Sequence, residues 1–81
     1  MGNYEEGRAY EDAVVKQLKA EISAADYSVK SFAEKLGMNY FTIRRYLTGE
    51  REMPFGVFAQ ICAALKIDPA DLMARAIARM K

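Results

Sequence analysis

The sequence predicts an all-α fold of five helices. Apolar residues recur at helical spacing along most of the 81 residues, and no segment shows the alternating pattern of a strand. Glycines, prolines and capping residues fall between the periodic segments, where helices end and begin. A chain of this length forms one small domain with a modest core. We therefore expect a single compact domain over residues 8–81, preceded by a flexible N-terminal tail at residues 1–7.

The first two helices are marked by periodicity and by their ends. The first is expected from about Arg8 to Ala25, with an apolar face formed by Tyr10, Val14, Leu18 and Ile22. The second begins after Ser28, whose hydroxyl is a good N-cap. It ends at Gly37, because glycine adopts the left-handed backbone of a helix end without strain.

The remaining three helices follow in the same way. Asn39 is expected to cap a third helix that Gly49 ends. Pro54 suits the first turn of a fourth, whose apolar stripe is Phe55, Phe58, Ile61, Cys62 and Leu65. Asp68 and Pro69 begin a fifth, since they combine a capping carboxylate with a preset backbone. Its apolar face is Leu72, Met73, Ala76, Ile77 and Met80.

The segment 28–49 contains the strongest functional signal. Ala33 lies four residues before Gly37, and Ile43 lies six after it, the spacing of two short helices that cross at a steep angle. Arg44 and Arg45 then fall on the outer face of the second helix of this pair. A nucleic-acid phosphate or base edge could meet them there.

The charges of the chain are segregated along it. Residues 1–27 carry six acidic residues against three basic ones, a net charge of −3. Residues 28–51 carry five basic residues against two acidic ones, a net charge of +3, and residues 52–81 carry a net charge of +1. The helix pair is therefore the part of the surface expected to attract an anionic partner.

Several other functions are disfavoured by composition. With no histidine and a single cysteine, Cys62, we expect no disulfide and no Cys/His zinc site. The acidic residues Glu5, Glu6, Glu11 and Asp12 have no partner base or nucleophile, so we expect a solvated helix start and no enzyme. No apolar run is long enough for a membrane helix, and the start lacks the apolar core of a signal peptide. We expect no cofactor, no metal and no small-molecule substrate.

Two segments resemble a known family. Residues 28–51 read SxxSFAEKLGMNxxTIRRYLTGER, and residues 64–72 read ALKIDPADL. They resemble the Cro/CI-type helix-turn-helix family, also called XRE, whose members include the phage lambda and 434 repressors. The resemblance covers roughly Arg8 to Ala76 and implies a compact lambda-repressor-like fold with its motif at residues 28–49. The segment RRYLTGER with the following Met53 and Pro54 is similar to repressors of temperate phages of actinobacteria.

The resemblance also implies how DNA is contacted. The helix Asn39–Leu47 would lie in the major groove, with the preceding helix across the backbone. Base contact is then expected from Tyr40, Phe41, Arg44 and Arg45. Backbone contact is expected from Ser28, Lys30, Asn39, Thr48 and Arg51. We favour Arg44 for bases and Arg45 for base and phosphate together, because an arginine can bond both acceptors of a guanine edge.

The chain departs from the family pattern at three positions. Val29 stands where many relatives have a phosphate-binding glutamine, and Tyr40-Phe41 stands where lambda-type proteins have a base-reading Gln-Ser pair. The two aromatic residues could stack on sugar or touch thymine methyl groups. They could equally pack against Val29, and for Tyr40 the two interpretations have equal weight.

We expect a sequence-specific regulator that binds an operator in double-stranded DNA, most simply a phage-type repressor. We expect it in the cytoplasm of a bacterial cell, associated with the nucleoid. The alternative is an antitoxin or anti-repressor that acts mainly by binding another protein. The apolar stripe of residues 72–80 could pair in a homodimer or complete the core of a monomer.

Overall fold

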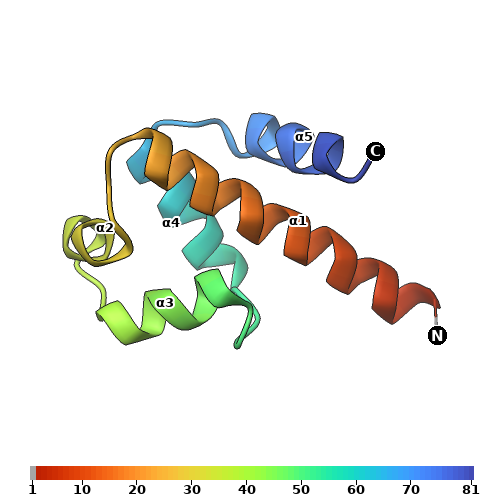
Figure 1. Cartoon of the computed structure of the whole chain (residues 1–81), viewed down its shortest axis with the longest axis horizontal. Coiled ribbons are helices and arrows are strands. Elements are labelled where there is room, and N and C mark those ends of the chain that lie inside the picture. The colour runs from red at the N-terminus through yellow and green to blue at the C-terminus, as the bar shows by residue number, and fades with distance from the viewer. Residues whose placement is uncertain (1) are drawn as a thin grey trace.

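The longest helix crosses the whole molecule and the other helices pack beside it (Figure 1). The computed structural model describes residues 2–81, and all regular structure in that range is helical: α1 Gly2–Ala24, α2 Val29–Leu36, α3 Tyr40–Thr48, α4 Phe55–Leu65 and α5 Pro69–Arg79. The predicted all-α fold of five helices is confirmed. A helix of 23 residues is about 34 Å long, close to the 37 Å long axis of the molecule.

The helices form two groups along α1. α5 packs against α1, as Figure 1 shows, and α2 packs against α3 and α4. α3 also contacts α1, so the helix pair α2–α3 is fixed to the same scaffold as α5. The N-terminal end of α1 projects beyond the other helices.

The predicted ends of α2 are confirmed in atomic detail. The Ser28 hydroxyl accepts a bond from the Ser31 amide at 3.0 Å, and the Ser31 hydroxyl accepts one from the Ser28 amide at 3.0 Å. This reciprocal pair is a capping box, with serine in the place that glutamate or glutamine usually takes. At the other end Gly37 has φ 70°, and the amide of Met38 donates to the Ala33 carbonyl at 3.0 Å. α2 therefore ends in a Schellman motif.

α3 and α5 also begin at the predicted caps. Asn39 Oδ1 accepts from the amides of Phe41 at 2.9 Å and Thr42 at 3.3 Å, while Gly49 ends α3 at φ 82°. Asp68 caps α5 by accepting from the Ala70 amide at 2.7 Å. These local bonds fix the direction in which each helix leaves its turn.

The core joins residues from all five helices. Its buried members include Leu18, Ile22, Phe32, Ala33, Ile43, Tyr46, Leu47, Phe58, Ile61, Cys62 and Leu72. Cys62 is fully buried among them, as predicted, and burial together with the nearby Asp68 raises the pKa of its thiol. It is thus a core residue and a poor nucleophile.

Two predictions need correction, one about the start of a helix and one about which side chains are buried. The first helix begins at Gly2, so residues 2–7, predicted as a tail, continue α1; Met1 lies outside the described residues. Glu5 lies in the first turn, where a negative charge complements the helix dipole. In addition, Phe55, Tyr10 and Met80 are 78%, 47% and 42% exposed, although the periodicity placed them on core faces. Phe55 is the first residue of α4 and Met80 is the C-cap of α5, so both stand at helix ends.

Candidate nucleic-acid interface

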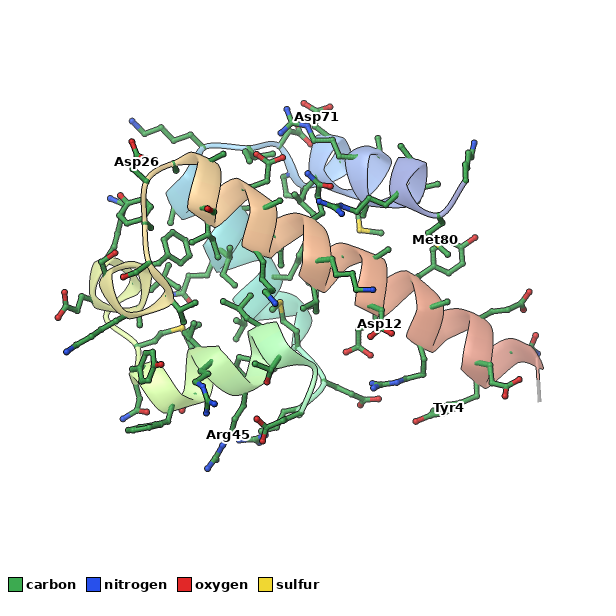
Figure 2. All side chains as sticks on the ribbon, in the orientation of Figure 1. Tyr4, Asp12, Asp26, Arg45, Asp71 and Met80 are labelled. Atoms are coloured by element: carbon green, nitrogen blue, oxygen red, sulfur yellow. The ribbon has the colours of Figure 1, made fainter. Side chains whose placement is uncertain are left out.

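α3 has one buried face and one free face. Ile43, Tyr46 and Leu47 are buried and hold the helix on the core. Arg44 and Arg45 are exposed on the other side, and Figure 2 shows Arg45 extending from α3 away from the body of the molecule. The structure thus presents the two arginines as the helical periodicity predicted. Tyr46 was missed, although its position three residues after Ile43 signals the same inner face.

The N-terminal end of α2 offers backbone donors beside a positive side chain. Lys30 is exposed in the first turn of the helix. The hydroxyl of Ser28 is engaged with Ser31, so Ser28 acts first as a cap. The first-turn amides of Val29 and Lys30 have no partner within an α-helix, and such amides form a site for phosphate.

Asn39 precedes α3, and within the described part of the chain only the oxygen of its side-chain amide is engaged in hydrogen bonds. Its oxygen caps α3, while its nitrogen has no hydrogen-bond partner among residues 2–81. An amide nitrogen in that place can donate to a phosphate oxygen. The predicted backbone role of Asn39 is therefore compatible with its structural role.

Thr48 and Arg51 lie at the C-terminal end of α3. The Thr48 hydroxyl is 3.2 Å from the Arg45 carbonyl, to which it donates, and 3.3 Å from a carboxylate oxygen of Glu50. The Arg51 amide donates to the same Arg45 carbonyl at 3.3 Å, and the guanidinium carbon of Arg51 lies 5.9 Å from the ring centre of Tyr46. The loop after α3 is thereby tied to the helix, with Arg51 held beside it.

Tyr40 and Phe41 have different surroundings. Tyr40 and Val29 are both half-buried and pack against the core. Phe41 is 60% exposed and meets Tyr40 edge-on, with ring centres 5.1 Å apart and planes at 68°. Tyr40 therefore helps to hold the start of α3 on the core, whereas Phe41 faces solvent.

The basic residues of segment 28–51 are free of acidic partners. Within residues 2–81, the ion pairs that involve side chains of described position join Arg8 to Glu11 and Glu52, and Arg75 to Glu21. None includes Lys30, Lys35, Arg44, Arg45 or Arg51. The positive charge that the sequence placed on this segment is thus available to an outside anion.

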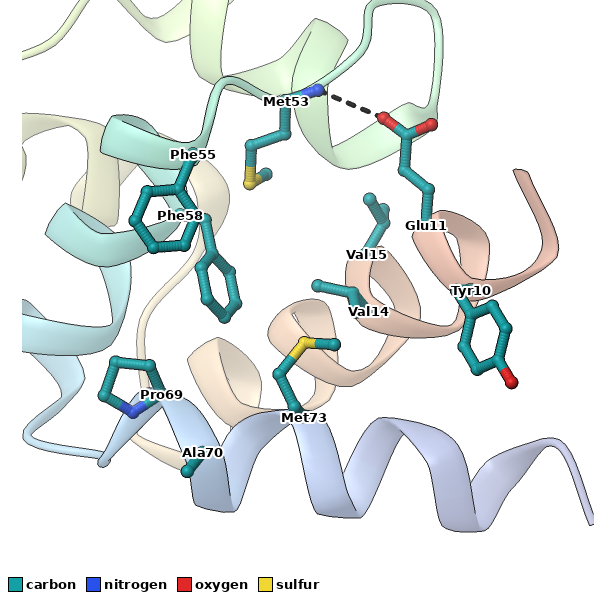
Figure 3. Close-up of a pocket in the computed structure, with 10 residues that line it drawn as sticks. All are labelled: Tyr10, Glu11, Val14, Val15, Met53, Phe55, Phe58, Pro69, Ala70 and Met73. Carbon is teal, nitrogen blue, oxygen red and sulfur yellow. Dashed lines mark hydrogen bonds between the residues drawn. The ribbon is translucent and has the colours of Figure 1, made fainter. Parts of the chain in front are cut away.

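A second surface is apolar, in contrast to the basic surface of segment 28–51. An apolar groove of about 450 Å³ lies between α1, the start of α4 and the start of α5 (Figure 3). It is lined by Tyr10, Glu11, Val14, Val15, Met53, Phe55, Phe58, Pro69, Ala70 and Met73. The charged member, Glu11, accepts from the Met53 amide at 3.2 Å and from Arg8 at 2.7 Å. The groove thus offers an outside ligand mainly hydrophobic contact.

The geometry of α2 and α3 can be set beside known families. The sequence profile of the Cro/C1-type HTH DNA-binding domain matches residues 17–76. The chain belongs to this family. The match includes all of α2, α3 and α4, the C-terminal part of α1 and most of α5. No curated protein and no solved structure gives a match.

Membership of the Cro/C1-type family makes the chain a DNA-binding regulator. The resemblance predicted from residues 28–51 and 64–72 is thereby confirmed, as is the helix-turn-helix fold. None of the described helices is both long enough and apolar enough to cross a membrane. The match begins at residue 17, so the projecting N-terminal end of α1 lies outside the matched range.

Proposed function

We propose that the chain is a sequence-specific regulator, a phage-type repressor, that binds an operator through the major groove. The observation that carries this proposal is the outer face of α3. Two arginines without acidic partners stand on a helix whose inner face is locked by three buried residues. An α-helix with its side chains is about 10–12 Å in diameter and fits a major groove about 12 Å wide.

In this proposal the roles are divided between base reading and positioning. Arg44 and Arg45 bond base edges, and Phe41 contacts bases beside them, with Tyr40 at the margin. Lys30, the first amides of α2, Asn39, Thr48 and Arg51 contact the backbone on both sides of the groove. Ser28 contributes by fixing the end of α2 that presents those amides. Occupancy of an operator would then block RNA polymerase.

Selection of bound DNA from a random pool tests the proposal. We expect one enriched motif that contains guanine. An inverted repeat with half-sites about 34–36 Å apart would show that a homodimer binds, and a single half-site would show a monomer. The proposal fails if no motif is enriched, or if the variant R44A/R45A enriches the same motif equally well.

The alternative function is an antitoxin or anti-repressor that acts by binding a protein. The observation in its favour is the apolar groove, whose rim exposes Tyr10 and Phe55. This function predicts a stoichiometric protein complex and no retention on DNA at moderate salt. The selection experiment separates it from the operator-binding proposal.

A further inference from the structure

Phe41 is an apolar side chain on a face that otherwise carries charge. In segment 28–51 it is the large hydrophobic residue that stands exposed, at 60%, and it is absent from the set of residues that pack on the core. A buried role therefore does not account for it. When an apolar group of the partner covers an exposed ring at a binding surface, the buried apolar area stabilises the complex.

The position of Phe41 is also fixed. Its amide donates to Asn39 at 2.9 Å, which sets the first turn of α3, and the ring of Tyr40 meets its ring edge-on. Tyr40 in turn packs against the core. The ring of Phe41 is thus supported at the N-terminal end of α3, the end that contacts base edges in helix-turn-helix proteins.

The spacing relative to the arginines defines what the ring would meet. Arg44 and Arg45 follow Phe41 by three and four residues, so they share its face and lie about 4.5 and 6 Å further along the axis. Successive base pairs are about 3.4 Å apart. Phe41 would therefore face a base one or two pairs from the guanine that an arginine contacts. The apolar group on a major-groove base edge is the C5 methyl of thymine.

We infer that Phe41 is a specificity-determining residue that reads the C5 methyl of a thymine one or two base pairs from the guanine contacted by Arg44 or Arg45. This inference rests on the proposed function. It assigns to the chain a mixed half-site, in which the arginines select guanine by hydrogen bonds and Phe41 selects thymine by apolar contact.

The test removes only the methyl group. In the selected operator, each candidate thymine is replaced by deoxyuridine, and affinity is measured by fluorescence anisotropy at fixed salt. Burial of one methyl group is worth about a fourfold change in affinity, so we expect about fourfold weaker binding for each thymine that Phe41 reads. The variant F41A should bind the thymine and deoxyuridine operators equally.

Phe55→Ala is the matched control, because Phe55 is also an exposed phenylalanine but lies outside segment 28–51. It should keep the full difference between thymine and deoxyuridine. Thermal unfolding of F41A should resemble that of the unsubstituted protein, which shows that the loss is not one of folding.

Two results would overturn the inference while leaving the proposed function intact. In the first, the deoxyuridine operator binds as tightly as the thymine operator although R44A/R45A still loses binding. In the second, F41A keeps the thymine preference, so another group reads the methyl. If no motif is enriched at all, the proposed function fails and this inference fails with it.

Discussion

The arginines of α3 and of α5 show the same side chain in two environments. On α5, Arg75 lies 2.7 Å from Glu21 and Arg79 lies 2.6 Å from Gln17, both on α1. On α3, Arg44 and Arg45 are exposed, and no described residue forms an ion pair with them. An arginine becomes structural where a neighbouring helix supplies an acceptor, and remains available to a ligand where none does.

The α1–α5 contact is a small polar network. Glu21 accepts from Arg75 and also from Gln17, at 2.8 Å, so three side chains from two helices are linked through one carboxylate. Hydrogen bonds from Arg75 and Gln17 hold the pKa of Glu21 below its ordinary value, although partial burial opposes them. The network secures α5 along α1, whereas α3 is held by its buried residues and forms no ion pair within residues 2–81.

The largest difference is expected from the double variant R44A/R45A. Each arginine that bonds a guanine edge contributes about 1–3 kcal/mol of discrimination. The free energy of specific binding should therefore weaken by several kcal/mol in total. Thermal unfolding followed by circular dichroism should be unchanged, because neither residue packs on the core. Anisotropy on the selected operator measures the affinity. Equal binding by R44A/R45A and the unsubstituted protein would contradict the comparison.

A smaller effect is expected from Lys30→Ala. If Lys30 contacts one phosphate, its removal should weaken binding to all sequences alike. It should also reduce the slope of log affinity against log salt by about 0.9. Titrations on the selected operator and on an unrelated duplex, each at several salt concentrations, measure both quantities. Asp71→Ala, at an exposed position of α5, is the control and should leave the slope as it was. A loss confined to the operator would indicate base reading instead.

Arg75→Ala should behave in the opposite way to the α3 variants. The pair with Glu21 is half-exposed on the arginine side, so its loss should cost about 0.5–1 kcal/mol and lower Tm by about 2–8 °C. DNA affinity at a temperature well below Tm should not change. Differential scanning calorimetry and anisotropy together check this pair of outcomes. A loss of DNA binding without a change in Tm would place Arg75 at the interface.

The smallest effect concerns pH. Because the pKa of Glu21 is lowered on folding, its contribution to the free energy of unfolding is present above the unfolded value, about 4.5, and is lost as pH falls through the folded value. The difference in stability between the protein and E21Q should therefore shrink from about 0.5 kcal/mol near pH 7 toward zero in acid. Urea titrations at several pH values measure it. A constant difference would mean that Glu21 acts only by packing.

The sequence predicted helix ends well because their chemistry is local. Ser28, Asn39 and Asp68 cap through bonds that span two or three residues, and Gly37 and Gly49 supply backbone geometry that needs no distant partner. The same holds for the arginines of α3, since helical periodicity alone separates them from Ile43.

What the sequence could not show is how far each neighbour extends. Periodicity tells which face of a helix is apolar but not how much of that face its neighbours cover, so Phe55 and Met80 were expected in the core and are exposed. The rotamers that engage the hydroxyls of Ser28 and Thr48 were equally hidden. The absence of acceptors around Arg44 and Arg45 depends on how α1 and α2 pack against α3, which only the fold reveals.

The ring of Tyr46 beneath Arg51 has a consequence for the thermodynamics of recognition. A free arginine side chain loses about 2 kcal/mol of rotamer entropy when a ligand immobilises it. The ring already restrains the Arg51 side chain, and the hydrogen bond from the Arg51 amide to the Arg45 carbonyl restrains its backbone, so part of that loss occurs on folding. When DNA arrives, less entropy remains to be lost in ordering this loop. Because this entropic cost is smaller, the contacts that Arg51 makes with DNA contribute more to the binding affinity.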